Sequence, residues 1–396
     1  MKTKMSVKTA VVMTALAFLL TMCLPGTASA MQESGYFKLK KLNKVLAESL
    51  DFDLNLDAFA ALDLDLDFDL GDMDLNIKEM FGEAGEKYKE KYEEKFDKTV
   101  KLAGDGRVEL SNVSGDVTVK TWNRNEVKID ALKVSRATSK EKARENADKV
   151  KIVVSNEGDL VRVKTEYPKE KKDNKNLHVS ITYVLTVPKG ASPSVSTVSG
   201  DVEIADIDGD VKASTVSGGV HLGKIGGGVK AKSVSGGIVL EGAKKGARCD
   251  VVSGSIKVSD VVGEVSAKCV SGNIKLFDIR GNVDVETTSG EIYLTNIAGA
   301  DHVRAKILSG DLKYEGEILG SGVYEFQSHS GDVTLYIPAS SAFDLEAKTF
   351  SGSIDSDFEI TLSGKISKKS IRGKANGGGA DLEVQTFSGD VVIKKK

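Results

Sequence analysis

From residue 199 onward, apolar and polar positions recur along the chain with a fixed period. The marker of the period is a Ser-Gly pair, and the first six pairs follow one another at intervals of 18 residues. A fixed period in this range is the sequence signature of a repeat architecture, in which each repeat stacks on the next. The pairs begin at 199, 217, 235, 253, 271 and 289, and then at 309, 330, 351 and 388.

Within each 18-residue repeat, the apolar positions have the spacing of short strands. If the Ser of each pair is position 0, small or apolar residues recur at positions 3, 5, 8, 12, 14 and 17. The gaps of 2, 3 and 4 then repeat, which divides the repeat into two nine-residue units, each with one strand. We expect all six positions to face the interior of a coil. In one repeat they are Val220, Leu222, Ile225, Val229, Ala231 and Val234.

Glycine marks the corner before each strand. Gly adopts positive φ without the steric penalty that a Cβ imposes, and a sharp corner requires such a backbone. The predicted fold is therefore all-β: a parallel β-solenoid of 18-residue coils, with right-handed winding, which is the rule for parallel connections. The expected corners are Gly200, Gly218, Gly236, Gly254, Gly272, Gly290, Gly310, Gly331, Gly352 and Gly389.

The segment before the repeats is also rich in strand patterns, but it is less regular. Apolar residues alternate with polar ones in 106–122 and 126–134, and further strands lead up to Pro188. Residues 138–150 interrupt them with a helical pattern. We therefore predict an N-terminal β cap over 101–190, continuous with solenoid repeats over 191–396.

Residues 31–100 have a different character. The segment 50–75 alternates Asp with Leu or Phe, and because Asp is a poor strand former we interpret it as an acidic arm. A strand whose Asp face collects cations such as Ca²⁺ is the alternative. Residues 78–98 place Ala84, Tyr88, Tyr92 and Phe96 on one helical stripe, which predicts an amphipathic helix docked on the body of the protein. A partner or membrane-surface helix is the alternative there.

The first 30 residues resemble a signal peptide. A start with three lysines is followed by an apolar run at 10–24 and by the small-residue cleavage pattern Ala28-Ser29-Ala30. Cys23 raises the alternative of lipidation, although Met22 stands where a small residue is expected. We therefore expect an exported protein that is periplasmic, at the cell surface or extracellular, with no transmembrane segment in the mature chain.

The net charge bears on the kind of partner, and the cysteine content bears on whether a disulfide forms. The formal net charge is −3, and loss of the three lysines in residues 1–30 makes the mature chain still more acidic, which argues against nucleic acid as a partner. Cys249 and Cys269 would remain after cleavage. They stand at different positions of their coils, so a direct disulfide would need a register shift and we expect both to be unpaired.

Candidate chemistry is sparse. No nucleophile, zinc or phosphate-loop motif occurs, and the four histidines share no position in the repeat, so we assign no catalytic, cofactor-binding or metal residues and expect no enzyme. One alternative is a polysaccharide-acting β-helix enzyme, but coils 199–308 lack the long loops that would wall a cleft. The other is a calcium-binding β-roll, suggested by Asp206, Asp208 and Asp210, whose pattern the next coil does not repeat.

Position 13 is basic in three successive coils, at Lys212, Lys230 and Arg248, with Lys232, Lys244 and Lys245 nearby. Stacked strands would place these three cations about 4.8 Å apart on one sheet. The plain reading is a solvated face. The functional hypothesis is that this basic strip binds an acidic polymer, either an envelope glycan or the protein's own Asp-rich arm at 50–75.

Several stretches resemble a known family. The segments NVSGDVTVKTWNRNEVKIDA (112–131) and YVLTVPKG (183–190), together with the STVSGDVEI and STVSGGV repeats, are similar to the bacterial "putative adhesin" family of β-strand-repeat proteins, a domain-of-unknown-function family. The resemblance covers about 101–396. It implies an exported, adhesin-like structural or binding module of the cell envelope or surface, and it supplies no catalytic residues.

Overall fold

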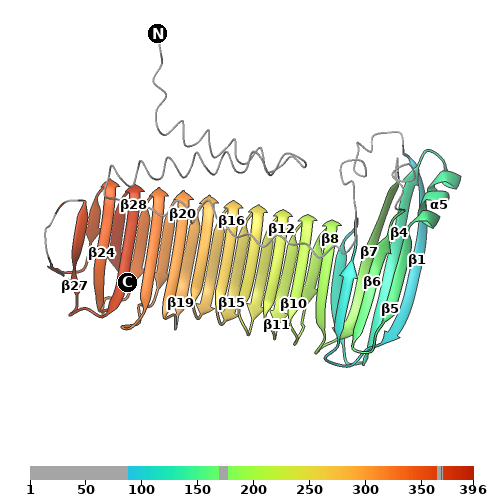
Figure 1. Cartoon of the computed structure of the whole chain (residues 1–396), viewed down its shortest axis with the longest axis horizontal. Helices are drawn as coiled ribbons and strands as arrows, with labels where there is room; N and C mark the ends of the chain where they lie inside the picture. Colours follow the sequence, from blue (N-terminus) through green and yellow to red (C-terminus); the bar gives the residue numbers. More distant parts are fainter. Residues whose placement is uncertain (1–87, 169–176, 364–366, 368) are drawn as a thin grey trace, which may run out of the picture. The chain divides into compact units, whose positions relative to one another are not determined.

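The computed structural model describes residues 88–168, 177–363, 367 and 369–396. In this part of the chain nearly every element is a strand, and the strands form one sheet of 14 and one of 15 (Figure 1). The parallel β-solenoid predicted from the repeats is confirmed. The predicted signal peptide, the predicted acidic arm at 50–75 and the first ten residues of the helix predicted over 78–98 lie outside the described residues.

Each regular coil contributes one strand to each sheet. Val220, for example, pairs in parallel with Val202 and with Ile238, the residues 18 positions before and after it. The strands of the 14-stranded sheet in these coils are β9 (Val202–Ala205), β11 (Val220–Ile225), β13 (Ile238–Ala243), β15 (Ile256–Val262), β17 (Ile274–Arg280), β19 (Ile292–Ala298) and β21 (Leu312–Gly316). Those of the 15-stranded sheet are β8 (Ser192–Ser199), β10 (Val211–Ser217), β12 (Val229–Ser235), β14 (Ala247–Ser253), β16 (Val265–Ser271), β18 (Val283–Ser289) and β20 (His302–Ser309).

The interior contains five of the six predicted positions. Residues at positions 3, 5, 8, 12 and 14 are buried, but the prediction for position 17 is wrong. Strand alternation continues from position 14 to position 16, so Thr215 and Ser233 point inward and are fully buried. Their neighbours Val216 and Val234 are left half-exposed on the outer face.

The two halves of a coil also differ in backbone conformation. Position 7 is left-handed in five coils, at Asp206, Lys224, Asp260, Asp278 and Asn296, with φ between +53° and +60°. This conformation interrupts the alternation, which is why position 8 faces inward after a gap of three residues. Asp and Asn tolerate the left-handed region better than most residues, and this explains their recurrence there.

The buried side chain at position 16 binds the corner glycine at the start of its own repeat. Thr215 Oγ1 donates to the carbonyl of Gly200 at 3.1 Å, and Ser233 Oγ donates to Gly218 at 3.1 Å. The Cys269 thiol makes the corresponding contact with Gly254 at 3.2 Å. A corner carbonyl that points inward would otherwise be unpaired, so a small side chain with a donor suits this position.

The predicted glycine corners are present. Nine of the ten glycines have φ between +136° and +155°; the exception is Gly352, which lies outside the left-handed region. At Gly272, a Cβ would overlap the carbonyl oxygen of Gly254 in the coil below. Both the backbone conformation and the close stacking of the coils therefore require glycine here.

At the N-terminal end, the order of coils in space departs from the order in the chain. Strands β2 and β3 lie between β6/β7 and β8/β9, so Val117 pairs with Tyr183 on one side and Val202 on the other. Helix α5 (Lys140–Lys149) forms where predicted and is capped by Ser139. The remaining strands here are β1 (Glu90–Lys101), β2 (Arg107–Ser111), β3 (Val117–Trp122), β4 (Glu126–Ala137), β5 (Lys151–Asn156), β6 (Leu160–Glu166) and β7 (His178–Pro188).

The prediction of a helix over 78–98 is wrong from residue 90 onward. Strand β1 occupies this region and pairs antiparallel with β4 along its whole length. Tyr92 and Phe96 are four residues apart, so they share a face of a strand as well as of a helix, with Glu94 between them. Glu94 accepts a hydrogen bond from Lys133 Nζ at 2.8 Å, and the backbone of β1 pairs with the edge of β4 from Glu90 to Lys101.

The C-terminal end also contains an inserted coil. Strand β28 lies between β22 and β24, and β29 lies between β23 and β25, so the last coil in the chain is not the last in the stack (Figure 1). This explains the 37-residue interval between the last two Ser-Gly pairs. The strands are β22 (Val323–Ser330), β23 (Val333–Ile337), β24 (Phe343–Ser351), β25 (Ile354–Ser356), β26 (Ile360–Leu362), β27 (Ser370–Ala375), β28 (Ala380–Ser388) and β29 (Val391–Lys395).

Candidate functional site

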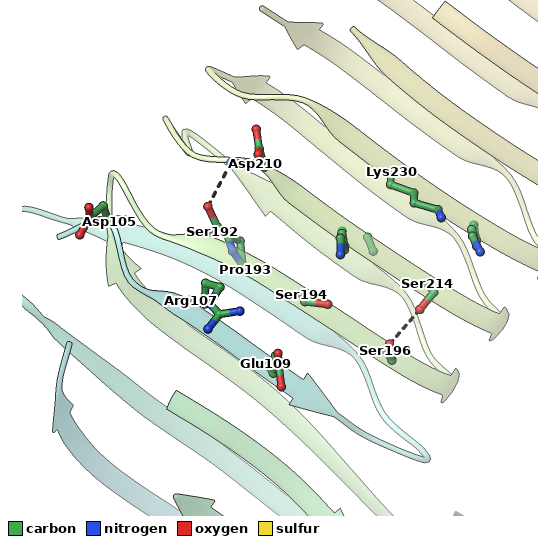
Figure 2. Close-up of a pocket in the computed structure, with 13 residues that line it drawn as sticks. Asp105, Arg107, Glu109, Ser192, Pro193, Ser194, Ser196, Asp210, Ser214 and Lys230 are labelled. Carbon is green, nitrogen blue, oxygen red and sulfur yellow. Dashed lines mark hydrogen bonds between the residues drawn. The ribbon is translucent and has the colours of Figure 1, made fainter. Parts of the chain in front are cut away.

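A groove of about 630 Å³ lies on the outer face of the 15-stranded sheet, across β2, β8, β10 and β12. Figure 2 shows Arg107 and Glu109, Ser194, and Lys230 projecting from neighbouring strands on this face. Serine side chains of β8 and β10 form much of its floor. The charged side chains that line it are Arg107, Lys212, Lys230 and Lys232, together with Asp105, Glu109 and Asp210.

The sheet brings the three residues of the basic strip together in the predicted register. Lys212 pairs with Lys230, and Lys230 pairs with Arg248, on three adjacent parallel strands. Lys212 and Lys230 line the groove, whereas Arg248 lies one strand beyond it. The geometric part of the prediction is therefore confirmed for all three, and two of them belong to the groove.

Arg248 differs from the lysines in its surroundings. Its Nε donates to Oδ2 of Asp250 at 3.0 Å, and Asp250 is fully buried. Burial raises the pKa of Asp250, and the neighbouring Arg248 opposes that shift. Much of the positive charge of Arg248 is thus offset by a carboxylate of its own strand.

Two of the three groove carboxylates are bound to groups outside the groove. Glu109 accepts a hydrogen bond from Arg162 at 2.8 Å, and Asp210 accepts one from the backbone N–H of Gly228 at 2.8 Å. Their negative charge is therefore partly offset. The lysines lie beside serine hydroxyls, two of which, Ser196 Oγ and Ser214 Oγ, are hydrogen-bonded to each other at 2.9 Å. Ammonium and hydroxyl groups together are donors that suit a phosphate or carboxylate group.

Sequence reasoning missed a second column of charges beside the strip. At position 15 of four coils, and at the residue paired with it in the next, basic and acidic residues alternate on five successive strands, and most are buried. The 18-residue recurrence of alternating sign was visible in the sequence and could have revealed it. Oδ1 of Asp250 and Oε1 of Glu286 are buried without a hydrogen-bond partner. The column is Lys232, Asp250, Lys268, Glu286 and Lys306.

The other predicted candidates are separate from this groove or bound elsewhere. Asp206 pairs with Lys224 at 3.5 Å, and Asp208 pairs with Lys189 at 3.6 Å, so the D-x-D-G-D acids have different partners. Within the described residues, no group of three or more His, Cys, Asp or Glu side chains could hold a metal ion. Cys249 and Cys269 lie in different columns, and both are free and buried.

The repeat architecture matches a known protein family. The Toastrack DUF4097 family profile aligns with residues 106–315 and 280–394, most of the chain. The chain belongs to this family. No curated protein matches it. In the described part of this Toastrack protein, no helix is long and apolar enough to cross a membrane.

Solved structures similar to this Toastrack protein have low sequence identity to it. One is a "putative cell adhesion protein" from Clostridium sporogenes, with 11% identity, a TM-score of 0.18, and coverage of 77% of this chain and 100% of that chain. A "putative adhesin" from Bacteroides fragilis has 10% identity and a TM-score of 0.30, covering 76% and 97%. A "putative lipid binding protein" from Parabacteroides distasonis has 11% identity and a TM-score of 0.30, also covering 76% and 97%.

Proposed function

We propose that this protein is an exported, non-catalytic binding module of the cell envelope or surface whose groove binds an anionic polymer. The observation that carries the proposal is the pairing of Lys212 with Lys230 in the groove, with Lys232 beside them. Export is supported by the character of residues 1–30. The non-catalytic role is supported by the regular coils and the absence of a catalytic motif in the sequence.

The geometry of the strip suits a linear ligand. Cations on adjacent strands are about 4.8 Å apart, so a polymer lying across the strands meets one cation at each step. Each lysine ammonium offers three donors, and the serine hydroxyls of β8 and β10 add neutral ones. Because the groove is open to water, we expect the attraction to be moderate and to weaken as salt increases.

The direct test is charge reversal with a matched control. In a double variant, Lys212→Glu and Lys230→Glu, binding to soluble alginate or polyphosphate should fall at least about tenfold at low ionic strength. The control is Lys257→Glu, an exposed lysine on β15 of the other sheet, which should leave the affinity unchanged.

Affinities would be measured by calorimetry across a salt series, with the purified chain starting at Met31. The wild-type affinity should fall steadily as salt rises. Equal affinity for the double variant and the wild type, or no wild-type affinity for either polymer, would contradict the proposal.

A further inference from the structure

The column at position 13 has opposite charges at its two ends. Its basic end, Lys212, Lys230 and Arg248, lies on β10, β12 and β14. The column continues through Ser266, Asp284 and Arg304 on β16, β18 and β20. Its acidic end, on β22, β28 and β24 in that order, consists of Glu325, Glu383 and Glu346.

The inserted last coil creates this acidic end. Glu383 pairs with Glu325 on one side and with Glu346 on the other. Three glutamates on adjacent strands repel one another, as do the three cations at the basic end. Local partners offset part of this cost: Glu325 lies 3.8 Å from Arg304, and Glu346 lies 2.7 Å from Lys348.

An apolar ridge runs parallel to the charged column on the same outer face, and each of its residues directly precedes a Ser-Gly pair. At the basic end it consists of half-exposed valines, and at the acidic end it consists of stacked rings. His329 and Phe387 have ring centroids 4.9 Å apart, Phe387 and Phe350 are 4.8 Å apart, and Phe350 is 46% exposed. The ridge reads Val216, Val234, Val252, Val270, Thr288, Leu308, His329, Phe387 and Phe350.

One symmetry operation generates a second copy in which the charged column and the apolar ridge each face a complementary set of residues. A two-fold axis along β18 (Val283–Ser289), in the plane of the face, places β10 opposite β24 of a second copy, β12 opposite β28, and β14 opposite β22. Each basic residue then meets a glutamate: Lys212 meets Glu346, Lys230 meets Glu383, and Arg248 meets Glu325. Three of the four valines at one end of the ridge likewise meet a ring at the other, and the fourth, Val270, meets Leu308.

From this complementarity we infer that the outer face of the 15-stranded sheet binds a second copy of this chain face to face, with the two stacks running in opposite directions and the facing strands parallel. Nine strands about 4.8 Å apart span about 38 Å, and a width of about 20 Å gives an interface on the order of 800 Å² per copy. That is the size of an ordinary specific interface. On the axis, Asp284 of each copy lies 3.6 Å from its own Arg304, which limits repulsion between the two aspartates.

This inference goes beyond the proposed function but uses the same lysines. A second copy and an anionic polymer would therefore compete for Lys212 and Lys230. The acidic end, by contrast, takes part only in self-association, so the two proposals respond differently to its substitution.

The experiment uses two charge-reversed variants of the chain starting at Met31. The acidic variant carries Lys212→Glu, Lys230→Glu and Arg248→Glu; the basic variant carries Glu325→Lys, Glu346→Lys and Glu383→Lys. Sedimentation equilibrium should find the wild type dimeric at low salt and dissociating as salt rises, and each variant alone monomeric. An equimolar mixture of the two variants should form a heterodimer, because every reversed charge then faces its opposite.

The mixture also controls for folding, since two misfolded variants would not restore a defined dimer. A wild type that is monomeric at low salt and at about 100 µM protein would overturn the inference. A mixture that fails to associate would also overturn it, as would a dimer lost in the opposite-sheet variant Lys257→Glu. Polymer binding that persists in a monomeric basic variant supports the proposed function independently.

Discussion

The middle coils and the two ends of the stack are built from the same repeat, but they are joined differently. In the middle, each strand pairs with residues 18 positions away, as Ala231 does with Ala213 and Cys249. At the ends, pairing spans much longer intervals: Asp116 accepts a hydrogen bond from the backbone of Asp201, 85 residues away, and Thr386 donates to Gly331, 55 residues away.

The difference shows how a repeat protein ends. A parallel stack leaves an open edge at each end, with unpaired N–H and C=O groups that invite further pairing. Here antiparallel strands cover three of the four sheet edges: β4 and β1 on one sheet and β5 on the other at the N-terminal end, and β27 and β26 at the C-terminal end. The inserted coils connect these covering strands to the stack through segments that are distant in the chain. Each end therefore depends on contacts between residues that the 18-residue period does not relate.

We expect the largest effect when the last coil of the chain is deleted, and a much smaller effect when a middle coil is deleted. Removing residues 380–396 takes away β28 and β29, which pair with four other strands. We expect β24 to β27 to lose protection from hydrogen exchange completely. Removing one middle coil, residues 255–272, should instead leave a shorter folded stack, since the strands on either side carry the same pattern.

Hydrogen-exchange mass spectrometry on both deletions tests this comparison. If β24 and β27 remain protected without the last coil, the inserted coil is not what holds the C-terminal end.

The second expected effect concerns the corners of the middle coils. Gly272→Val should lower the free energy of unfolding by about 1–3 kcal/mol or more, because valine is forced to positive φ and its Cβ meets the carbonyl of Gly254. Lys257→Val, on the outer face, should change it by less than about 0.5 kcal/mol. Gly299, with φ +63° and open space around it, isolates the conformational cost: Gly299→Ala should cost about 1 kcal/mol.

Urea unfolding of the three variants gives these values. Equal midpoints for Gly272→Val and Lys257→Val would refute the assignment of the corner.

A smaller effect concerns how stability depends on pH, because two acidic residues have pKa values shifted in opposite directions. Burial raises the pKa of Asp250 in the middle, whereas a hydrogen bond from Lys348 lowers the pKa of Glu346 near the C-terminal end. The stability that Asp250 contributes is therefore complete below its ordinary pKa of 3.8 and is lost as pH rises through its folded-state value. The contribution of Glu346 is present above 4.5 and is lost as pH falls through its folded-state value.

Lowering the pH from 7 towards 3 should thus favour the middle over the C-terminal end, as read by local hydrogen exchange corrected for intrinsic rates. Asp250→Asn should flatten the response of the middle, and Glu346→Gln that of the end. An unchanged pH profile in Asp250→Asn would show that its buried charge does not control the middle coils.

The smallest expected effect concerns the two buried cysteines, whose thiols should not react in the folded protein. Burial raises the pKa of Cys249 to about 12 and that of Cys269 to about 11, so both thiols stay protonated near neutral pH. The folded chain starting at Met31 should not react with a thiol reagent, and the denatured, unreduced chain should show two thiols. Finding none after denaturation would mean that the cysteines are joined.

The sequence predicted the candidate site better than it predicted the edges of the fold. Lys212, Lys230 and Arg248 were placed on adjacent strands because each is 18 residues from the next, and in the middle of the stack this interval is the distance between neighbours. The groove itself was not predictable, since Arg107 and Glu109 reach it from β2, which ends at Ser111, whereas β10 begins only at Val211. Position 17 was misplaced because valine there matched a nine-residue count, whereas strand alternation buries position 16.

By itself, the sequence determined the period, the glycine corners, most of the inward columns and the register of the basic strip. These are local properties, since spacing and backbone conformation decide them wherever neighbours in the stack are neighbours in the chain. Only the tertiary structure decided that β1 is a strand, that β2 and β3 precede β8 and β9 in the stack, and that Glu383 lies between Glu325 and Glu346. Those outcomes depend on which open edge a distant segment covers, and that is a matter of complementary pairing between edges rather than of local pattern.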